Sequence, residues 1–315
     1  MNILTLLQKM HADKTLSSEQ LHLLLNIHSK KLFSLNQELK YFLYAGFILV
    51  IAGIGFTIKQ YFAHLGDISV IGALTLGSLS AFIYCFIKGR PFSNSEVATP
   101  NMLFDYILFF GCTLYSMDIA YLETQLHVFG DLWDNHLLIS AILFLFLAYR
   151  FDNRLVLSLA LSTLAAWFGF TLSKYHISFE EYHRIYAVTY SLITFCLGSY
   201  LYRIAVKRHF FDIYLNFAIH FLFIGLISGV IQYKLLSLYF PALSVCFAIL
   251  VLYALRTKKF LYMLYAIVYG YIGITIVILD FIERETALVF IYFIITSAVV
   301  IISIFSLSRK FKVNK

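Results

Sequence analysis

The chain has 315 residues, of which 61% are hydrophobic, 18% aromatic and only 13% charged, and its formal net charge is +7. This composition excludes an ordinary soluble domain, because a single globular core cannot hide that much apolar surface. The sequence therefore predicts an all-α integral membrane protein.

The first 40 residues form the only sizeable segment outside the predicted membrane domain. Ser17 and Gln20 fit a helix capping box, and Leu21, Leu24 and Leu25 follow at helical spacing. We interpret residues 1–40 as a cytoplasmic amphipathic helical pair that lies on the membrane or on the cytoplasmic face of the bundle. A docking site for a cytoplasmic protein partner is the alternative interpretation.

Apolar windows of about 20 residues, the length that crosses a hydrocarbon core of roughly 30 Å, recur along the rest of the chain. Ten spans are predicted, at residues 41–58, 68–87, 103–122, 137–149, 155–172, 185–201, 210–231, 235–255, 260–279 and 287–307. They make up a ten-helix transmembrane domain, residues 41–307, which is followed by a basic cytoplasmic tail, residues 308–315.

The distribution of cations predicts the orientation of this domain. With the amino terminus in the cytoplasm, 19 of the 24 Lys and Arg residues fall on the cytoplasmic side. The other side receives Lys59, Lys174, Arg184, Lys234 and Arg284. The asymmetry predicts a bacterial inner-membrane protein with both termini in the cytoplasm, and it explains the net charge without a nucleic-acid partner.

The weakest predicted span is 137–149, which is only about 20 Å long at a helical rise of about 1.5 Å per residue. If it did not cross, the cations at residues 203–208 and 256–259 would lie on the outside. We therefore predict that it crosses. Small residues at helix-packing spacing, such as Gly225 and Gly229, predict close packing within the chain, with a homodimer seam as the alternative.

One family resemblance rests on three parts of the sequence. These are the glycine-bearing first span, with Gly46, Gly53 and Gly55, the run at residues 125–131 and the run at residues 148–154. Together with the amino-terminal helical pair they look like the bacterial predicted-membrane-protein family known as domain-of-unknown-function family 2157. The resemblance covers residues 3–172 best. It implies a bacterial multi-pass membrane protein and brings no activity with it.

A polar stripe runs up the span at residues 210–231, where Asp212, Asn216 and His220 are four residues apart. An ionisable side chain at membrane depth is costly, so His220 is a candidate functional residue. Other polar residues are expected at similar depth, namely Tyr190, Thr194, Tyr269 and Tyr271. We predict that these side chains line a hydrated cavity. The alternative is that His220 bonds a neighbouring carbonyl or tyrosine and only fixes the helix register.

A second polar group lies on the predicted outer side. Its candidates are Asp118, Glu123, His127, Asp131, Asp134 and His136. A solvated loop is the simplest interpretation, an electrostatic vestibule for cations is another, and a divalent-cation site is a third. Asp118 lies within its span and is expected to extend toward the interface or to pair with Lys59.

The turn at residues 150–154 is interpreted as a tight cytoplasmic turn whose arginines anchor lipid head groups. We find no signature of a soluble enzyme, such as a Walker loop, and we expect no enzymatic activity, no cofactor and no metal. The leading hypothesis is a membrane protein that binds or transports a small solute or ion through a cavity among the later helices. The alternative is a scaffold or sensor that acts through its amino-terminal helices.

Overall fold

The computed structural model describes residues 66–97, 99–175, 179–233, 238–281 and 286–313, together with the single positions 11, 13, 17, 46, 49 and 53. Within these ranges the chain is helical and contains no strand. The predicted amino-terminal helical pair, the first span at residues 41–58 and Lys59 lie outside the described residues.

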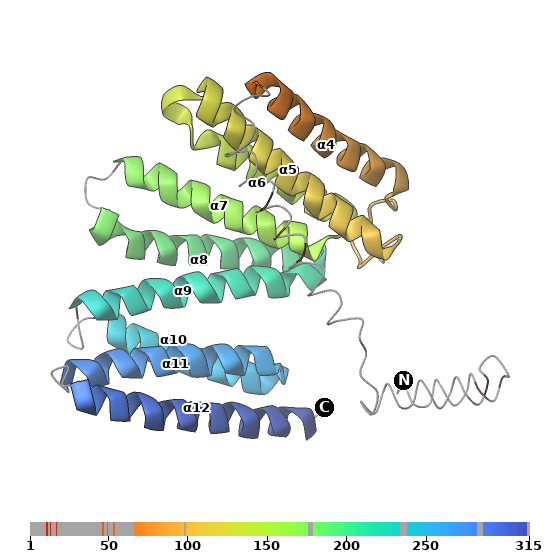
Figure 1. The fold of residues 1–315 in the computed structure, drawn as a ribbon. Helices are drawn as coiled ribbons and strands as arrows, with labels where there is room; N and C mark the ends of the chain where they lie inside the picture. Colours follow the sequence, from red (N-terminus) through yellow and green to blue (C-terminus); the bar gives the residue numbers. More distant parts are fainter. Residues whose placement is uncertain are drawn as a thin grey trace. The chain divides into compact units, whose positions relative to one another are not determined.

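Helices follow one another along the chain, and the connection at residues 89–101, between the first two of them, is longer than those of the later described turns (Figure 1). Their bounds are α4 (Asp67–Lys88), α5 (Met102–Leu126), α6 (Asn135–Phe151), α7 (Arg154–Tyr175), α8 (Phe179–Arg203), α9 (Phe211–Tyr233), α10 (Tyr239–Thr257), α11 (Phe260–Phe281) and α12 (Thr286–Val313). Two 3₁₀ turns, η2 (Gly130–Leu132) and η3 (Arg208–Phe210), precede α6 and α9.

Eight of these helices are long and apolar enough to cross a membrane, and α6, with 17 residues, is the shorter exception. The nine predicted spans that fall on described residues therefore each coincide with a helix. The prediction of a multi-pass helical protein is confirmed in that coarser form, while the count of ten and the side on which each loop lies stay predictions.

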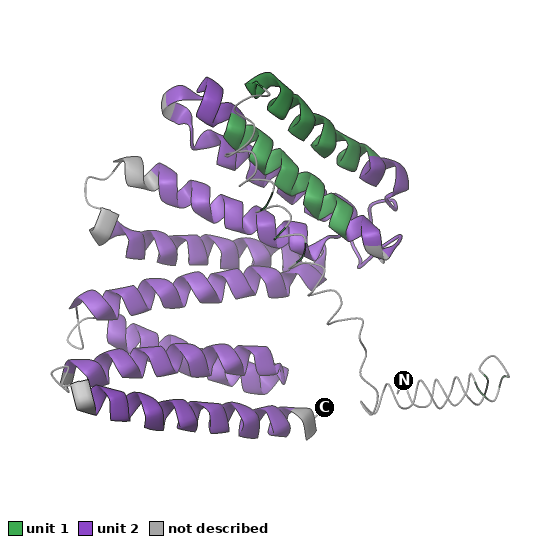
Figure 2. Ribbon diagram, in the orientation of Figure 1, with its two compact units in different colours: residues 1–83, 106–121 green, residues 84–105, 122–315 purple. Residues whose placement is uncertain are grey.

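The chain divides into two compact units, which Figure 2 distinguishes by colour. The described helices of unit 1 are residues 67–83 of α4 and residues 106–121 of α5. Val70, Leu74 and Leu114 form its buried core. A Cβ on Gly77 would lie 3.1 Å from a methyl carbon of Leu114, so this glycine serves close helix packing within the unit.

Unit 2 contains residues 84–105 and 122–315. Two of its helix connections have only two residues, at α6–α7 and at α10–α11. In the α6–α7 turn Asp152 adopts the left-handed conformation with φ 58°. The Asp152 amide donates to the carbonyl of Ala148, and the Asn153 amide donates to the same carbonyl at 3.0 Å. This double capping ends α6. The Asn153 side-chain oxygen then accepts from the Leu155 and Val156 amides, at 2.9 Å each, and caps the start of α7. The prediction of a tight turn at residues 150–154 is confirmed.

Glycines let the helices of unit 2 approach closely. A Cβ on Gly198 of α8 would lie 2.5 Å from the Cβ of Tyr214 on α9. One on Gly225 would lie 2.9 Å from Val188 on α8, whereas Gly229 faces the ring of Tyr239 on α10. The two glycines of the GxxxG pattern thus pack against two different helices of the same chain, as predicted for packing within the chain.

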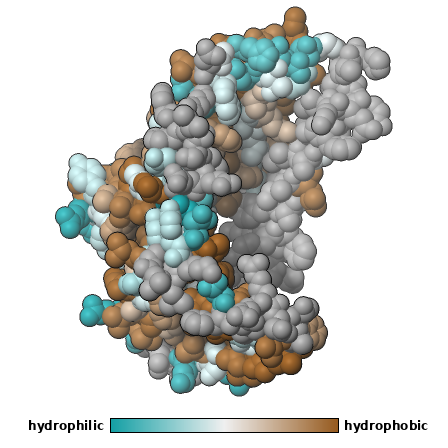
Figure 3. All heavy atoms as spheres, turned by 90° about the vertical axis from the view of Figure 1, so that its left-hand side faces the viewer, coloured by the Kyte–Doolittle hydropathy of each residue, from teal (hydrophilic) through white to brown (hydrophobic). Residues whose placement is uncertain are grey.

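The outer surfaces of the helices are strongly apolar. On α12 the side chains of Ile302 and Phe305 are 67% and 66% exposed. Hydrophobic residues also cover much of the visible surface in Figure 3. Exposed apolar surface of this extent suits helices that are surrounded by lipid.

Candidate anion-binding pocket

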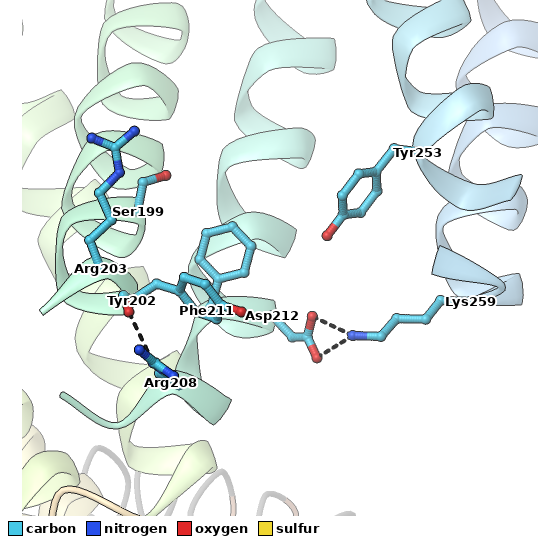
Figure 4. A pocket seen from close by; sticks show the side chains of 8 residues that line it. All are labelled: Ser199, Tyr202, Arg203, Arg208, Phe211, Asp212, Tyr253 and Lys259. Carbon is cyan, nitrogen blue, oxygen red and sulfur yellow. Dashed lines mark hydrogen bonds and ion pairs between the residues drawn. The ribbon is translucent and has the colours of Figure 1, made fainter. Parts of the chain in front are cut away.

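A pocket of about 460 Å³ lies in unit 2 among α8, α9, α10 and the α8–α9 and α10–α11 connections (Figure 4). We call it the cationic pocket. Its lining residues are Ser199, Tyr202, Arg203, Arg208, Phe211, Asp212, Tyr253 and Lys259.

The lining residues come from the ends of apolar helices, which places the pocket at the level where spans begin and end. Arg203 is the last residue of α8, and Arg208 is the first residue of η3. Lys259 lies in the connection from α10 to α11, directly after Lys258, whose φ of 53° ends α10. Cations at helix ends belong at the membrane–water interface, because they are costly in the hydrocarbon.

Three of the lining residues are cations and one, Asp212, is a carboxylate. Lys259 already neutralises this carboxylate, since its Nζ lies 2.7 and 2.6 Å from the two Asp212 oxygens. The Tyr262 hydroxyl donates to Asp212 at 3.0 Å. Arg203 and Arg208 are left as two positive charges without a carboxylate partner among the described residues.

Several donors of the pocket are unused by the described part of the chain. Arg208 donates only through Nε, to the carbonyl of Tyr202 at 3.3 Å. Arg203 and the hydroxyls of Ser199 and Tyr253 make no hydrogen bond there. Figure 4 shows the Arg203 guanidinium beside Ser199 and the Tyr253 hydroxyl pointing toward Phe211 and Asp212. The pocket therefore offers several hydrogen-bond donors and an excess of positive charge, which together suit an anion.

The two sequence neighbours of the pocket residue Arg208 belong to a buried ion network. The Asp152 side chain is 2% exposed and that of Lys207 is fully buried, and Lys207 Nζ lies 3.2 Å from Asp152 Oδ2. His209 Nε2 lies 2.5 Å from Asp152 Oδ1, and the Val97 amide donates to Oδ2 at 2.5 Å. We call these groups the Asp152 network.

The Asp152 network fixes the segment that carries Arg208. Lys207 adopts φ 46°, and its amide donates to the carbonyl of Asn94 at 3.0 Å. Its Nζ also lies 3.4 Å from the carbonyl of Ser95. With Lys207 and His209 both directed at Asp152, the residue between them is held at the pocket. Arg208 is thereby a preorganised donor.

Sequence reasoning missed this network. It placed Asp152 only in the turn at residues 150–154 and assigned no role to His209. The sequence does show a tight turn rich in polar residues and, later, a loop of consecutive cations. However, Asp152 pairs with Lys207 and His209, which lie 55 and 57 positions further along the chain. Nothing in local spacing reveals such a pairing. Arg203, Arg208 and Lys259 were counted for topology and not considered as ligands.

The polar residues predicted to line a cavity make several separate contacts. The His220 ring nitrogen Nδ1 lies 2.6 Å from the Tyr269 hydroxyl, and the ring packs edge-on against Tyr265. Tyr190 donates to the carbonyl of Leu161 at 2.6 Å, while Thr194 is buried on α8. These contacts are the kind that fix helix packing.

Two members of that set lie apart from His220. Tyr271 hydrogen-bonds Thr296 between α11 and α12 at 3.0 Å. Asp212 lines the cationic pocket at the start of α9. Asn216 lies between the two regions, and its buried Oδ1 has no hydrogen-bond partner among the described residues. A role of these residues in solute binding stays a prediction, and only Asp212 reaches the pocket.

The outer polar residues mostly bond to their own surroundings. Glu123 accepts from the Phe129 amide at 2.8 Å, and His136 contacts the carbonyl of Trp133. Asp134 accepts from Thr171 at 2.5 Å. His127 ends α5 in the left-handed conformation, and Asp131 lies in η2. Within the described ranges no group of three or more His, Cys, Asp and Glu side chains is placed to hold a metal ion.

Asp118 lies within unit 1. Its Oδ2 accepts from the Thr75 hydroxyl at 2.6 Å, and the residue is 5% exposed. The other carboxylate oxygen has no partner among the described residues. The predicted partner, Lys59, lies outside them, so the predicted pair is untested.

Comparisons of the chain with family models, with curated proteins and with solved structures found no match. The resemblance to domain-of-unknown-function family 2157 stays a prediction from the sequence.

Proposed function

We propose that the chain is a multi-pass protein of the bacterial inner membrane, with both termini in the cytoplasm, that binds a small anionic solute in the cationic pocket. Membership of domain-of-unknown-function family 2157 is part of this proposal and adds no activity to it. In this orientation the pocket opens on the cytoplasmic side.

One observation carries the proposal: Arg203 and Arg208 face the same pocket, and Lys259 neutralises its single carboxylate. Arg203 and Arg208 leave the lining with an excess of positive charge, which a bound anion neutralises. Arginine also offers several donors in a fixed plane, which suits oxyanions. The pocket volume of about 460 Å³ lies in the range of small-molecule sites.

The pocket lies at one end of the helices, whereas His220, nearer their middle, is paired with Tyr269. The geometry therefore favours binding at one face. Movement of the solute across the bilayer stays a prediction from the sequence, as does the alternative role of scaffold or sensor.

The test is the thermal stability of the full chain in detergent, measured with chloride, sulfate, phosphate and citrate at equal ionic strength. A bound anion stabilises the folded state, so at least one multivalent anion is expected to raise the unfolding midpoint. In the Arg203→Gln/Arg208→Gln variant the same rise is expected to need about tenfold more anion, because charge-assisted hydrogen bonds are lost.

The matched control is Arg309→Gln/Lys310→Gln, which removes two exposed cations from the end of α12. It should respond to anions like the unmodified protein. If no anion stabilises the protein, or if the control loses the response as completely as the pocket variant does, the proposal is wrong.

A further inference from the structure

We propose that the anion held in the cationic pocket is a phosphate group at the level of the membrane–water interface. This inference rests on the proposed function, because it names the ligand class of the same pocket. Its sources are the head group of an anionic phospholipid or a soluble phosphate compound, and the test below separates the two.

The arrangement of donors favours phosphate over a carboxylate. A carboxylate presents two oxygens in one plane, which a single guanidinium satisfies. The pocket instead has two guanidinium groups and two hydroxyls in its lining, with Arg203 beside Ser199 on α8, Arg208 on η3 near Tyr202, and Tyr253 across the pocket on α10 (Figure 4). Donors from α8, η3 and α10 surround the space, and a tetrahedral group with several oxygens uses donors from several directions.

Charge supports the same ligand. Three cations and one carboxylate leave two positive charges on the lining. A phosphomonoester carries about −1.5 to −2 charges near neutral pH and therefore balances them. A phosphodiester head group carries one negative charge. It neutralises one of the two positive charges and leaves the lining with one.

Depth and neighbouring surface favour a lipid as the source. Arg203 ends one candidate span and Arg208 begins the next, which is the depth of lipid phosphates. One helical turn from Ser199 toward the middle of α8 lies Phe195, 44% exposed. One turn from Tyr253 on α10 lies Ile249, 60% exposed. An acyl chain that extends from a phosphate in the pocket meets these apolar side chains.

The experiment uses the full chain in detergent and has two arms. In the first, native mass spectrometry counts bound phosphatidylglycerol, with a diacylglycerol of the same acyl chains as the lipid without phosphate. In the second, inorganic phosphate or citrate is added at increasing concentration. The unfolding midpoint of the protein and the amount of phosphatidylglycerol that stays bound are measured at each concentration. Each arm compares the unmodified protein with Arg203→Gln/Arg208→Gln and with the control Arg309→Gln/Lys310→Gln.

A lipid source predicts saturable binding of phosphatidylglycerol but not of the diacylglycerol, about tenfold weaker in the pocket variant and unchanged in the control. A soluble source predicts that inorganic phosphate stabilises the protein and displaces the lipid. Asp212→Asn removes the only carboxylate of the lining and should tighten phosphate binding severalfold in either case. A purely structural role of the pocket does not predict such a gain.

Two outcomes overturn the inference. If citrate stabilises the protein through the pocket while neither phosphatidylglycerol nor inorganic phosphate does, the ligand is a different anion and the proposed function stands. If no anion acts through the pocket, the inference and the proposed function both fail.

Discussion

Lys207, Arg208 and His209 are consecutive residues that serve two different environments. The first and the third are directed at the buried carboxylate of Asp152, and the second lies at the cationic pocket. A buried cation is tolerated only with a close counter-charge and further hydrogen bonds. Asp152 and the carbonyl of Ser95 supply both to Lys207, and the geometry of Arg208 follows from them.

We predict that Asp152→Asn lowers the free energy of unfolding by about 3 kcal/mol, because it leaves the buried Lys207 ammonium without its counter-charge. Adding Lys207→Met should recover part of the loss, since both partners of the pair are then gone. Chemical unfolding of the detergent-solubilised protein gives both values.

The exposed pair of Arg154 and Glu96, at 2.7 Å, is the matched control for that prediction. Breaking it with Glu96→Gln should cost less than about 1 kcal/mol, as is usual for solvated ion pairs. Equal losses for Asp152→Asn and Glu96→Gln would contradict the assignment of a buried network.

At the scale of elements, the helices follow from local sequence and their packing partners do not. The windows that predicted nine of the spans depend on about 20 neighbouring residues each, so hydropathy locates them well. The span predicted at residues 137–149 extends to Asn135–Phe151 in the structure, because polar residues at both ends continue the helix. Which faces meet depends on residues far apart in the chain.

We predict that Gly198→Ala lowers the unfolding midpoint markedly, because the added Cβ meets the Cβ of the buried Tyr214 at 2.5 Å. The Tyr214 hydroxyl lies 3.0 Å from that of Tyr149, so its side chain is held and α8 must move away from α9. Gly169→Ala on α7 is the control, since its Cβ meets nothing within 4 Å, and it should be neutral or slightly stabilising. A similar midpoint for both variants would show that α8 and α9 are not closely packed at Gly198.

At the scale of the whole molecule, the candidate site could be predicted only where it depends on local sequence, because its other residues are brought together by helix packing. Asp212 was singled out because it shares a helix face with His220, which is a local pattern. Arg203 and Arg208 lie at the two ends of the α8–α9 connection, and Lys259 lies in the α10–α11 connection about 50 residues later. Only the packing of α8 and α10 against α9 brings them to one pocket. Charge counts could say that these loops share a side of the membrane, but not that their side chains meet.

The predicted orientation of the helices in the membrane can be tested by labelling two exposed positions at opposite ends of unit 2. Within unit 2 the loops at residues 89–101, 152–153 and 204–207 lie at one end, because Lys207 bonds both Asn94 and Asp152. Val128, 61% exposed, lies in the α5–α6 connection, at the opposite end of α6 from Asp152. If the excess of cations marks the cytoplasm, a cysteine in place of Val128 faces outward and one in place of Glu96 faces inward.

Labelling of intact cells with a membrane-impermeant maleimide is therefore expected to modify the Val128→Cys protein and to leave the Glu96→Cys protein unmodified until the membrane is opened. The four native cysteines all lie in apolar helices. The protein without an introduced cysteine therefore gives the background labelling. The opposite pattern would place the cationic pocket on the outer face, where anionic lipids and solutes of that side become its ligands. Labelling of both positions in intact cells would mean that α5 and α6 do not lie across the membrane as predicted.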